Sequence, residues 1–191
     1  MNLISTGIDE LDKILGGGVV FPHCIELISN NQTALIVALT IAKTNTSKTS
    51  ALITTSGAID LDAVNSVFGD QENNLIGSDK FQSYQDITKI VKEISTDIVI
   101  LDNINIYPRY QASKLFADMT TVAMENNRLF IVVSPRTDWR SPPASHYAGQ
   151  RIEFYESDDN NVVARTLKNV AAAAFKQSSF SFKERLCRGN P

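Results

Sequence analysis

The chain has 191 residues, of which 43% are hydrophobic and 20% are charged, and its formal net charge is −3. This composition is that of an ordinary globular protein, and it excludes extensive intrinsic disorder. The longest apolar stretch, residues 34–42, is too short to span a bilayer, and no basic-then-apolar N-terminal segment indicates secretion. Cys24 and Cys187 provide neither a disulfide framework nor zinc-ligand spacing. We therefore expect a protein without metal or membrane contact that is cytoplasmic, or nuclear in a eukaryote.

The charge is distributed unevenly along the chain. Residues 1–127 carry 8 basic and 15 acidic side chains, whereas residues 128–191 carry 10 basic and 6 acidic ones. The basic C-terminal part points to an anionic partner, but solvated surface side chains account for it equally well.

Strand and helix signals alternate up to residue 134. Helices are predicted over residues 9–15, 33–43, 61–68, 86–95 and 112–125. Buried strands are predicted over residues 24–29, 50–55, 98–101 and 129–133. Strands that alternate with helices indicate right-handed crossovers and a parallel sheet.

The pattern changes after residue 134. A proline-containing loop covers residues 135–149, and two β segments, 151–155 and 162–167, surround an Asp/Asn-rich turn. Phe180 and Phe182 alternate with serine and predict a last edge strand. The sequence thus predicts one α/β domain over residues 1–191, with a central, mostly parallel sheet flanked by helices and antiparallel C-terminal strands.

The opening residues are similar to a known family. Ser5-Thr6-Gly7, then Leu11-Asp12, then Gly16-Gly17-Gly18 resemble the start of the RecA/RadA recombinase core. Residues 98–103 resemble its Walker B strand, and residues 130–134 resemble the strand before a DNA-contacting loop. The resemblance covers about the whole chain and implies a RecA-like fold. Because the family's N-terminal DNA-binding domain has no counterpart here, it implies the short archaeal RadB type or another recombinase paralog.

The residues that would bind nucleotide depart from the family pattern. A phosphate loop has the form G-x-x-x-x-G-K-[ST], in which backbone N–H groups and a lysine hold the phosphates. Here only residues 30–32 separate the predicted strand from its helix. Residues 19–42 contain neither glycine nor lysine. Gln32 stands where the lysine belongs, and Thr33 is the remnant of the Mg²⁺-binding threonine. We therefore expect no bound cofactor.

Two further nucleotide-site positions follow from the alignment with the family. Ser56 replaces the glutamate that orients the attacking water, and serine is a poor base at neutral pH. Asp102 survives from the Walker B strand, although a capped strand end explains it as well. Without the loop, the lysine and the glutamate, we expect no ATPase activity; ATP and Mg²⁺ would bind only if a divergent site were completed by a partner.

Candidate DNA contacts gather in three segments. The loop after residue 134 carries Arg136, Trp139 and Arg140. The guanidinium groups of the arginines suit phosphate, and the indole ring of Trp139 suits stacking on a base. Arg109 lies beside Tyr110 in the segment after Asp102. The basic C-terminal part supplies further candidates, namely Lys168, Lys183 and Arg185.

Three functions remain open from the sequence. The first is a non-catalytic recombinase paralog, an accessory or mediator in homologous recombination or DNA repair. It would bind DNA, most naturally single-stranded, a RecA/RadA-type recombinase or a second paralog, as a homo- or hetero-oligomer. The second is a DNA-dependent ATPase of the RecA/RadB type with a divergent nucleotide site. The third is a KaiC-like regulatory scaffold that binds proteins only.

Overall fold

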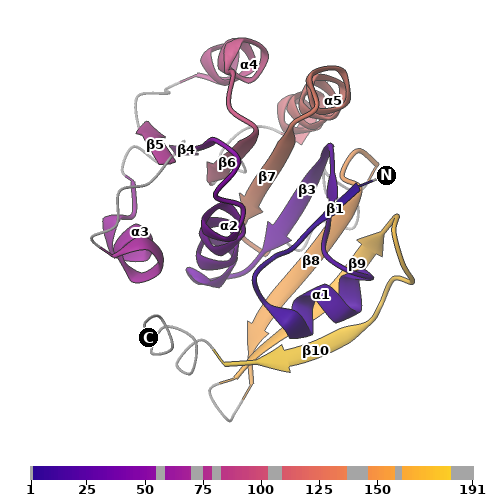
Figure 1. Ribbon diagram of the computed structural model, residues 1–191. Coiled ribbons are helices and arrows are strands. Elements are labelled where there is room, and N and C mark those ends of the chain that lie inside the picture. Colours follow the sequence, from indigo (N-terminus) through magenta and orange to yellow (C-terminus); the bar gives the residue numbers. More distant parts are fainter. Residues whose placement is uncertain are drawn as a thin grey trace.

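The structure, a computed structural model, describes residues 2–54, 59–69, 75–78, 83–102, 109–136, 146–157 and 161–181. The strands of its main sheet are β3 His23–Ile28, β4 Ser50–Thr54, β5 Leu75–Ser78, β6 Ile98–Asp102, β7 Leu129–Ser134, β8 Gln150–Glu156, β9 Val162–Asn169 and β10 Gln177–Phe180. Within the described residues these strands form one eight-stranded sheet in the order β10-β9-β8-β3-β7-β6-β4-β5. The pairs from β8 through β5 are parallel, whereas β9 pairs antiparallel with β8 and β10. This arrangement confirms the predicted α/β architecture with antiparallel C-terminal strands (Figure 1).

Helices cover both faces of the sheet. Their bounds are α1 Asp9–Leu15, α2 Thr33–Thr44, α3 Leu61–Phe68, α4 Tyr84–Glu93 and α5 Arg109–Asn126. Side chains of α1, α2 and α3 form one hydrophobic core with one face of the strands, and those of α4 and α5 form a second core with the other face (Figure 1). None of the described helices combines the length and apolar character needed to cross a bilayer.

The two cores follow from strand periodicity. Alternate side chains of a strand point to opposite faces, so Ile25 and Leu27 of β3 lie in the first core and Cys24 lies in the second. Helix α2 is apolar around most of its circumference because it packs against both the sheet and α3.

A second, two-stranded sheet forms near the N-terminus. It pairs β1 Asn2–Ile4 antiparallel with β2 Val19–Phe21, and neither strand is predicted from the sequence. The buried Gln150 side chain ties this sheet to the main one. Its Oε1 accepts from the backbone N of Val20 at 2.9 Å, and its Nε2 donates to the carbonyl of Gly18 at 3.2 Å.

Gly18 is the position where this packing leaves no room for a side chain. Its φ is +135°, and a Cβ built there would lie 2.2 Å from the carbonyl oxygen of Ile4. Gly69, at the C-terminus of α3, also has a positive φ of +59°, but a Cβ there meets nothing within 4 Å.

We expect Gly18→Ala to destabilise the protein by about 3 kcal/mol or more, since both the left-handed backbone and the steric overlap oppose it. Gly69→Ala is the matched control and costs about 1–3 kcal/mol, because only backbone strain opposes it: the φ of +59° at Gly69 goes with a ψ of −141°, which favours glycine. Urea unfolding of both variants measures the difference. Equal losses in the two variants would contradict the role of the β1–β2 packing.

Candidate functional site

The junction between β3 and α2 occupies the place of a phosphate loop. Strand β3 ends at Ile28 and α2 begins at Thr33, so four residues connect them. The backbone N of Ser29 still donates to the carbonyl of Ser134 in β7, at 3.1 Å. Because Ser29 is still hydrogen-bonded to β7, only residues 30–32 lie between the sheet and the helix, as the short spacing predicts.

The first N–H groups of α2 already have acceptors within the chain. The N–H of Thr33 donates to Asn31 Oδ1 at 3.0 Å, and that of Ala34 donates to Ser29 Oγ at 3.1 Å. Ser29 Oγ in turn donates to the carbonyl of Asn31 at 2.6 Å. The free N–H groups of a helix N-terminus are what binds phosphate in nucleotide-binding loops. Here two of them are occupied by side chains of the junction itself.

Gln32 and Thr33 are the predicted remnants of the lysine and the threonine of a phosphate loop. Neither offers a positive charge to a phosphate group. Gln32 Nε2 donates to Asp60 Oδ2 at 2.5 Å, and Asp60 Oδ1 caps α3 by accepting from the N–H of Ala63. Thr33 is buried. The position that supplies a cation in a phosphate loop therefore presents an amide held by a carboxylate.

Asp102 lies at the end of β6, as predicted, opposite Thr54 of β4. Burial raises the pKa of the Asp102 carboxyl above its ordinary value, and the negative charge of Asp60 raises this pKa further. A hydrogen bond from the Thr54 side chain acts in the opposite direction. Its environment thus disfavours the ionised form that would bind a cation.

A cleft of about 200 Å³ lies at this edge of the sheet. Its described lining consists of Ser29, Asn30, Asn31, Asp102, Val133, Ser134 and Pro135 and includes neither lysine nor arginine. Pockets for cofactors and drug-sized ligands commonly measure about 300–1,000 Å³. Both the size and the charge of the cleft are therefore unfavourable for a nucleoside triphosphate.

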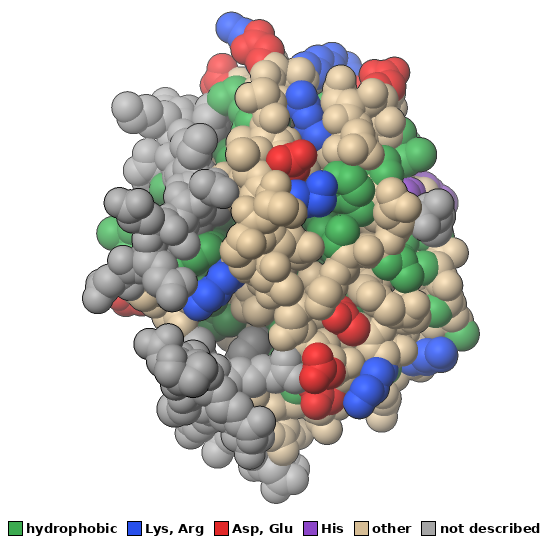
Figure 2. Space-filling view, in the orientation of Figure 1, with side chains coloured by type: hydrophobic (Ala, Val, Ile, Leu, Met, Phe, Trp, Pro, Cys, Tyr) green, Lys and Arg blue, Asp and Glu red, His purple; other side chains and the backbone are tan. Residues whose placement is uncertain are grey.

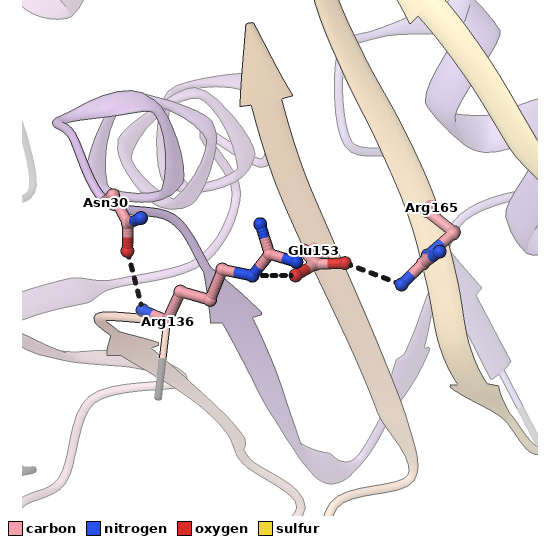
Figure 3. Close-up of polar contacts among 4 residues, drawn as sticks. All are labelled: Asn30, Arg136, Glu153 and Arg165. Atoms are coloured by element: carbon pink, nitrogen blue, oxygen red, sulfur yellow. Dashed lines mark hydrogen bonds and ion pairs between the residues drawn. The ribbon is translucent and has the colours of Figure 1, made fainter. Parts of the chain in front are cut away.

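Arg136, a predicted DNA contact, is anchored at both its backbone and its side chain (Figure 3). Its backbone N donates to Asn30 Oδ1 at 3.2 Å, and its Nε lies 3.0 Å from Glu153 Oε1. Arg165 Nη2 lies 2.9 Å from the other oxygen of the same carboxylate. Glu153 is buried, whereas the Arg136 and Arg165 side chains are 57% and 43% exposed. Two partly exposed arginine side chains thus share one buried carboxylate, which leaves a net positive charge.

A second ion pair lies deeper in the same sheet. Arg151 Nε is 2.7 Å from Glu26 Oε2, and both side chains are buried. Lys168 is Arg151's register partner in β9, and its Nζ donates to the carbonyl of His146 at 3.3 Å. Burial lowers the pKa of Lys168, and the charge of Arg151 lowers this pKa further. Lys168, a predicted DNA contact, thus belongs to a fixed charged array.

The remaining predicted site residues are not placed by the structure. Arg109 begins α5, but its side chain is outside what the structure describes. The following predicted residues also lie outside the described ranges: Ser56, Trp139, Arg140, Lys183 and Arg185. Tyr110, next to Arg109, is 72% exposed and lines a groove of about 590 Å³ together with Ser113, Lys114, Ala117 and Tyr147.

Sequence reasoning missed the acidic partners of this region. Asp60 and Glu153 decide the charge around Gln32 and Arg136, and neither lies in a recognisable motif. Glu26 carried a signal, because a glutamate inside a short apolar strand needs a buried cation. Its partner Arg151 is remote in sequence and becomes adjacent only through the β3–β8 pairing. Among the described residues, no group of three or more potential ligands is placed to hold a metal ion.

Comparison with known proteins shows the fold. No protein-family model matches the chain, and no curated protein does either. The crystal structure of a RadB recombinase is similar to this structure with a TM-score of 0.79, at 18% sequence identity, over 96% of this chain and 97% of that one. The chain therefore has a RecA-like fold, as the opening motif and the order of its strands predict.

The raised pKa of Asp102 predicts how stability depends on pH. Between the ordinary aspartate pKa and the raised value, the folded state holds more protons than the unfolded state, so ionisation of Asp102 lowers stability as pH rises. We expect Asp102→Asn to stabilise the protein at pH 7 and to lose this advantage below about pH 4. Urea unfolding between pH 3 and 7 measures it, and a variant less stable than the wild type at pH 7 would contradict it.

Proposed function

We propose that this protein is a non-catalytic RecA-like subunit that acts as an accessory or mediator in homologous recombination or DNA repair. It binds single-stranded DNA and a RecA/RadA-type recombinase. The observation that carries the proposal is the occupation of the first N–H groups of α2 by Ser29 and Asn31. The structural similarity to a RadB recombinase supports the recombination setting.

The electrostatics of the cleft support the loss of nucleotide binding. A triphosphate would have to displace two hydrogen bonds, meet the Asp60 carboxylate that holds Gln32, and do so without a lysine or arginine among the described lining residues. An oxyanion gains stability only from preorganised donors or cations. The junction supplies neither, so the fold is retained while the chemistry is lost.

We expect no saturable ATP binding up to about 1 mM with Mg²⁺ present, which corresponds to less than about 4 kcal/mol of binding free energy. Isothermal titration calorimetry measures binding, and phosphate release measures turnover. Binding in the micromolar range followed by hydrolysis would overturn the proposal in favour of a divergent DNA-dependent ATPase.

The DNA surface is proposed on the groove formed by α5 and Tyr147. Tyr110 is 72% exposed and Tyr147 is 37% exposed, and Lys114 lines the same groove. Exposed aromatic faces interleaved with basic side chains suit the stacked bases and phosphates of single strands. Arg136 adds an exposed guanidinium that stays in place through Glu153.

We expect labelled single-stranded DNA to bind at low salt and to dissociate as salt rises. Tyr110→Ala weakens binding about tenfold, because one stacked base is worth roughly 1–3 kcal/mol. Lys114→Ala lowers the slope of the logarithm of the binding constant against the logarithm of the salt concentration by about one unit. Fluorescence anisotropy measures both effects.

Lys92→Ala is the matched control for Lys114→Ala, because both lysines are exposed on helices and Lys92 lies on α4, away from the groove lining. It leaves the affinity unchanged. If the wild type fails to bind DNA at low salt, the DNA part of the proposal is overturned and a protein-only regulatory scaffold replaces it.

A further inference from the structure

The turn between β9 and β10 exposes an unusual run of apolar residues. Residues 170–175, here called the apolar turn, read Val-Ala-Ala-Ala-Ala-Phe, and Phe175 is 76% exposed while Val170 is 46% exposed. The turn lies at the right-hand edge of the molecule in Figure 1, and hydrophobic side chains gather along that edge in Figure 2. A large exposed apolar side chain on such a run marks an interaction site more often than an isolated one does.

The N-terminal sheet extends this surface. Ala172 packs near Gly16, where a Cβ would lie 3.0 Å from the Ala172 Cβ. A Cβ at the neighbouring Gly17 would lie 3.2 Å from Leu3, a residue of β1 that is 38% exposed. The two glycines therefore let Leu3 and the apolar turn lie on one surface.

Hydrogen bonds hold the apolar turn in one conformation. At its first end, the N–H of Val170 donates to the carbonyl of Gly149 at 3.1 Å, and the N–H of Ala171 donates to Asn169 Oδ1 at 3.0 Å. At its other end, the N–H of Phe175 donates to the carbonyl of Thr166 at 2.7 Å. The N–H of Thr166 donates to the carbonyl of Lys176 at 2.9 Å. Both ends of the turn are thus fixed by hydrogen bonds before any partner binds, which lowers the entropy cost of binding.

Phe175 occupies a backbone position that favours glycine. Phe175 and Lys176 together oppose the single residue Thr166, which is the arrangement of a β-bulge whose first residue is usually a left-handed glycine. The φ of Phe175 is +62°, a strained value for a bulky side chain. Since the ring is mostly exposed, folding gains little from it. A residue that breaks a local rule without a compensating contact in the fold indicates a functional position.

The charges around the apolar turn select the kind of partner. Lys176 follows it directly, Lys168 precedes it by two residues, and Lys13 lies in the last turn of α1, whose C-cap Gly16 neighbours Ala172. A second copy of the chain docked through the same surface would bring these lysines together, which is unfavourable. The four alanines expose little apolar area each, so a bilayer would gain chiefly from Phe175 and Val170.

We propose that the apolar turn is the docking element for a partner protein that offers an apolar pocket with carboxylates at its rim, with Phe175 as the anchor. The inference rests on the proposed function, under which this partner is the RecA/RadA-type recombinase. Anchors of protein interfaces are typically aromatic side chains that fill such pockets.

The decisive variant is Phe175→Gly, because glycine accepts the left-handed backbone while the anchor is lost. Biolayer interferometry with the purified recombinase of the same organism measures binding. We expect the dissociation constant to rise about tenfold or more, with a thermal unfolding midpoint equal to or above that of the wild type. Lys176→Glu also weakens binding, since it reverses the charge next to the anchor. Phe175→Asn, which also tolerates the left-handed region, is a second variant if glycine alters the turn.

Leu61→Ala is the matched control, because Leu61 is a 65% exposed apolar residue on α3 that lies outside the apolar turn. It leaves the affinity within about twofold. Wild-type-like binding of both Phe175 variants overturns the inference and leaves the proposed function intact. Failure of the wild type to bind the recombinase overturns the proposed partner and the inference together.

Two further measurements address the other classes of occupant. Sedimentation velocity tests self-association, and co-sedimentation with phosphatidylcholine vesicles containing phosphatidylserine tests membrane binding. We expect neither for the wild type. Dimers or vesicle binding that disappear in Phe175→Gly would assign the apolar turn to a second copy or to a membrane and overturn the inference.

Discussion

The two hydrogen bonds that Ser29 and Asn31 accept from the first turn of α2 are the constraint on which the rest of the site depends. A helix that starts immediately behind a sheet edge has N–H groups without intrahelical partners, and these groups require acceptors. A bound phosphate meets this requirement in a nucleotide-binding protein, whereas here the chain meets it from within. Two N–H groups of the helix N-terminus therefore have acceptors without a ligand.

The same junction is connected to its neighbours on both sides. Asn31 Nδ2 donates to Glu156 at the end of β8, and Gln32 donates to Asp60 at the start of α3. Both acceptors are carboxylates, so the edge of the sheet that would receive a polyanion carries negative charge instead. Positive charge lies on the β8–β9 side, where Arg136 and Arg165 flank Glu153. The carboxylates Glu156 and Asp60 thus contact the junction through Asn31 and Gln32, whereas the cluster of Arg136, Glu153 and Arg165 carries net positive charge.

The fold was largely predictable from the sequence, because its main strands and helices carry strong periodicity. The helices Asp9–Leu15 and Leu61–Phe68 have the predicted bounds, and β6 and β7 extend one residue beyond theirs. Strands β1 and β2 have three residues each and offer no alternation to detect, and β5 was not predicted.

The candidate site was predictable only in part. The short connection between β3 and α2 was predictable, because its length and its lack of lysine can be read directly from the sequence. The side-chain conformations of Ser29 and Asn31 decide that these residues accept from the helix N–H groups, and the sequence does not show those conformations. The carboxylates of Asp60 and Glu153 reach Gln32 and Arg136 only through tertiary contacts. Phe175 escaped notice because an apolar residue near a strand suggests burial, whereas its backbone is left-handed and the residue is 76% exposed.

Asn30 gives the junction one more consequence. Its side-chain oxygen accepts a hydrogen bond from the backbone N of Arg136 at 3.2 Å, so the junction before α2 and the end of β7 are joined directly. In an ATP-driven machine, a link between these places would transmit the hydrolysis cycle to the segment after β7. Under the proposed non-catalytic function, this link would hold the end of β7 in a single constitutive state, so the affinity of the subunit for its partners would be set once by folding rather than reset at every turnover.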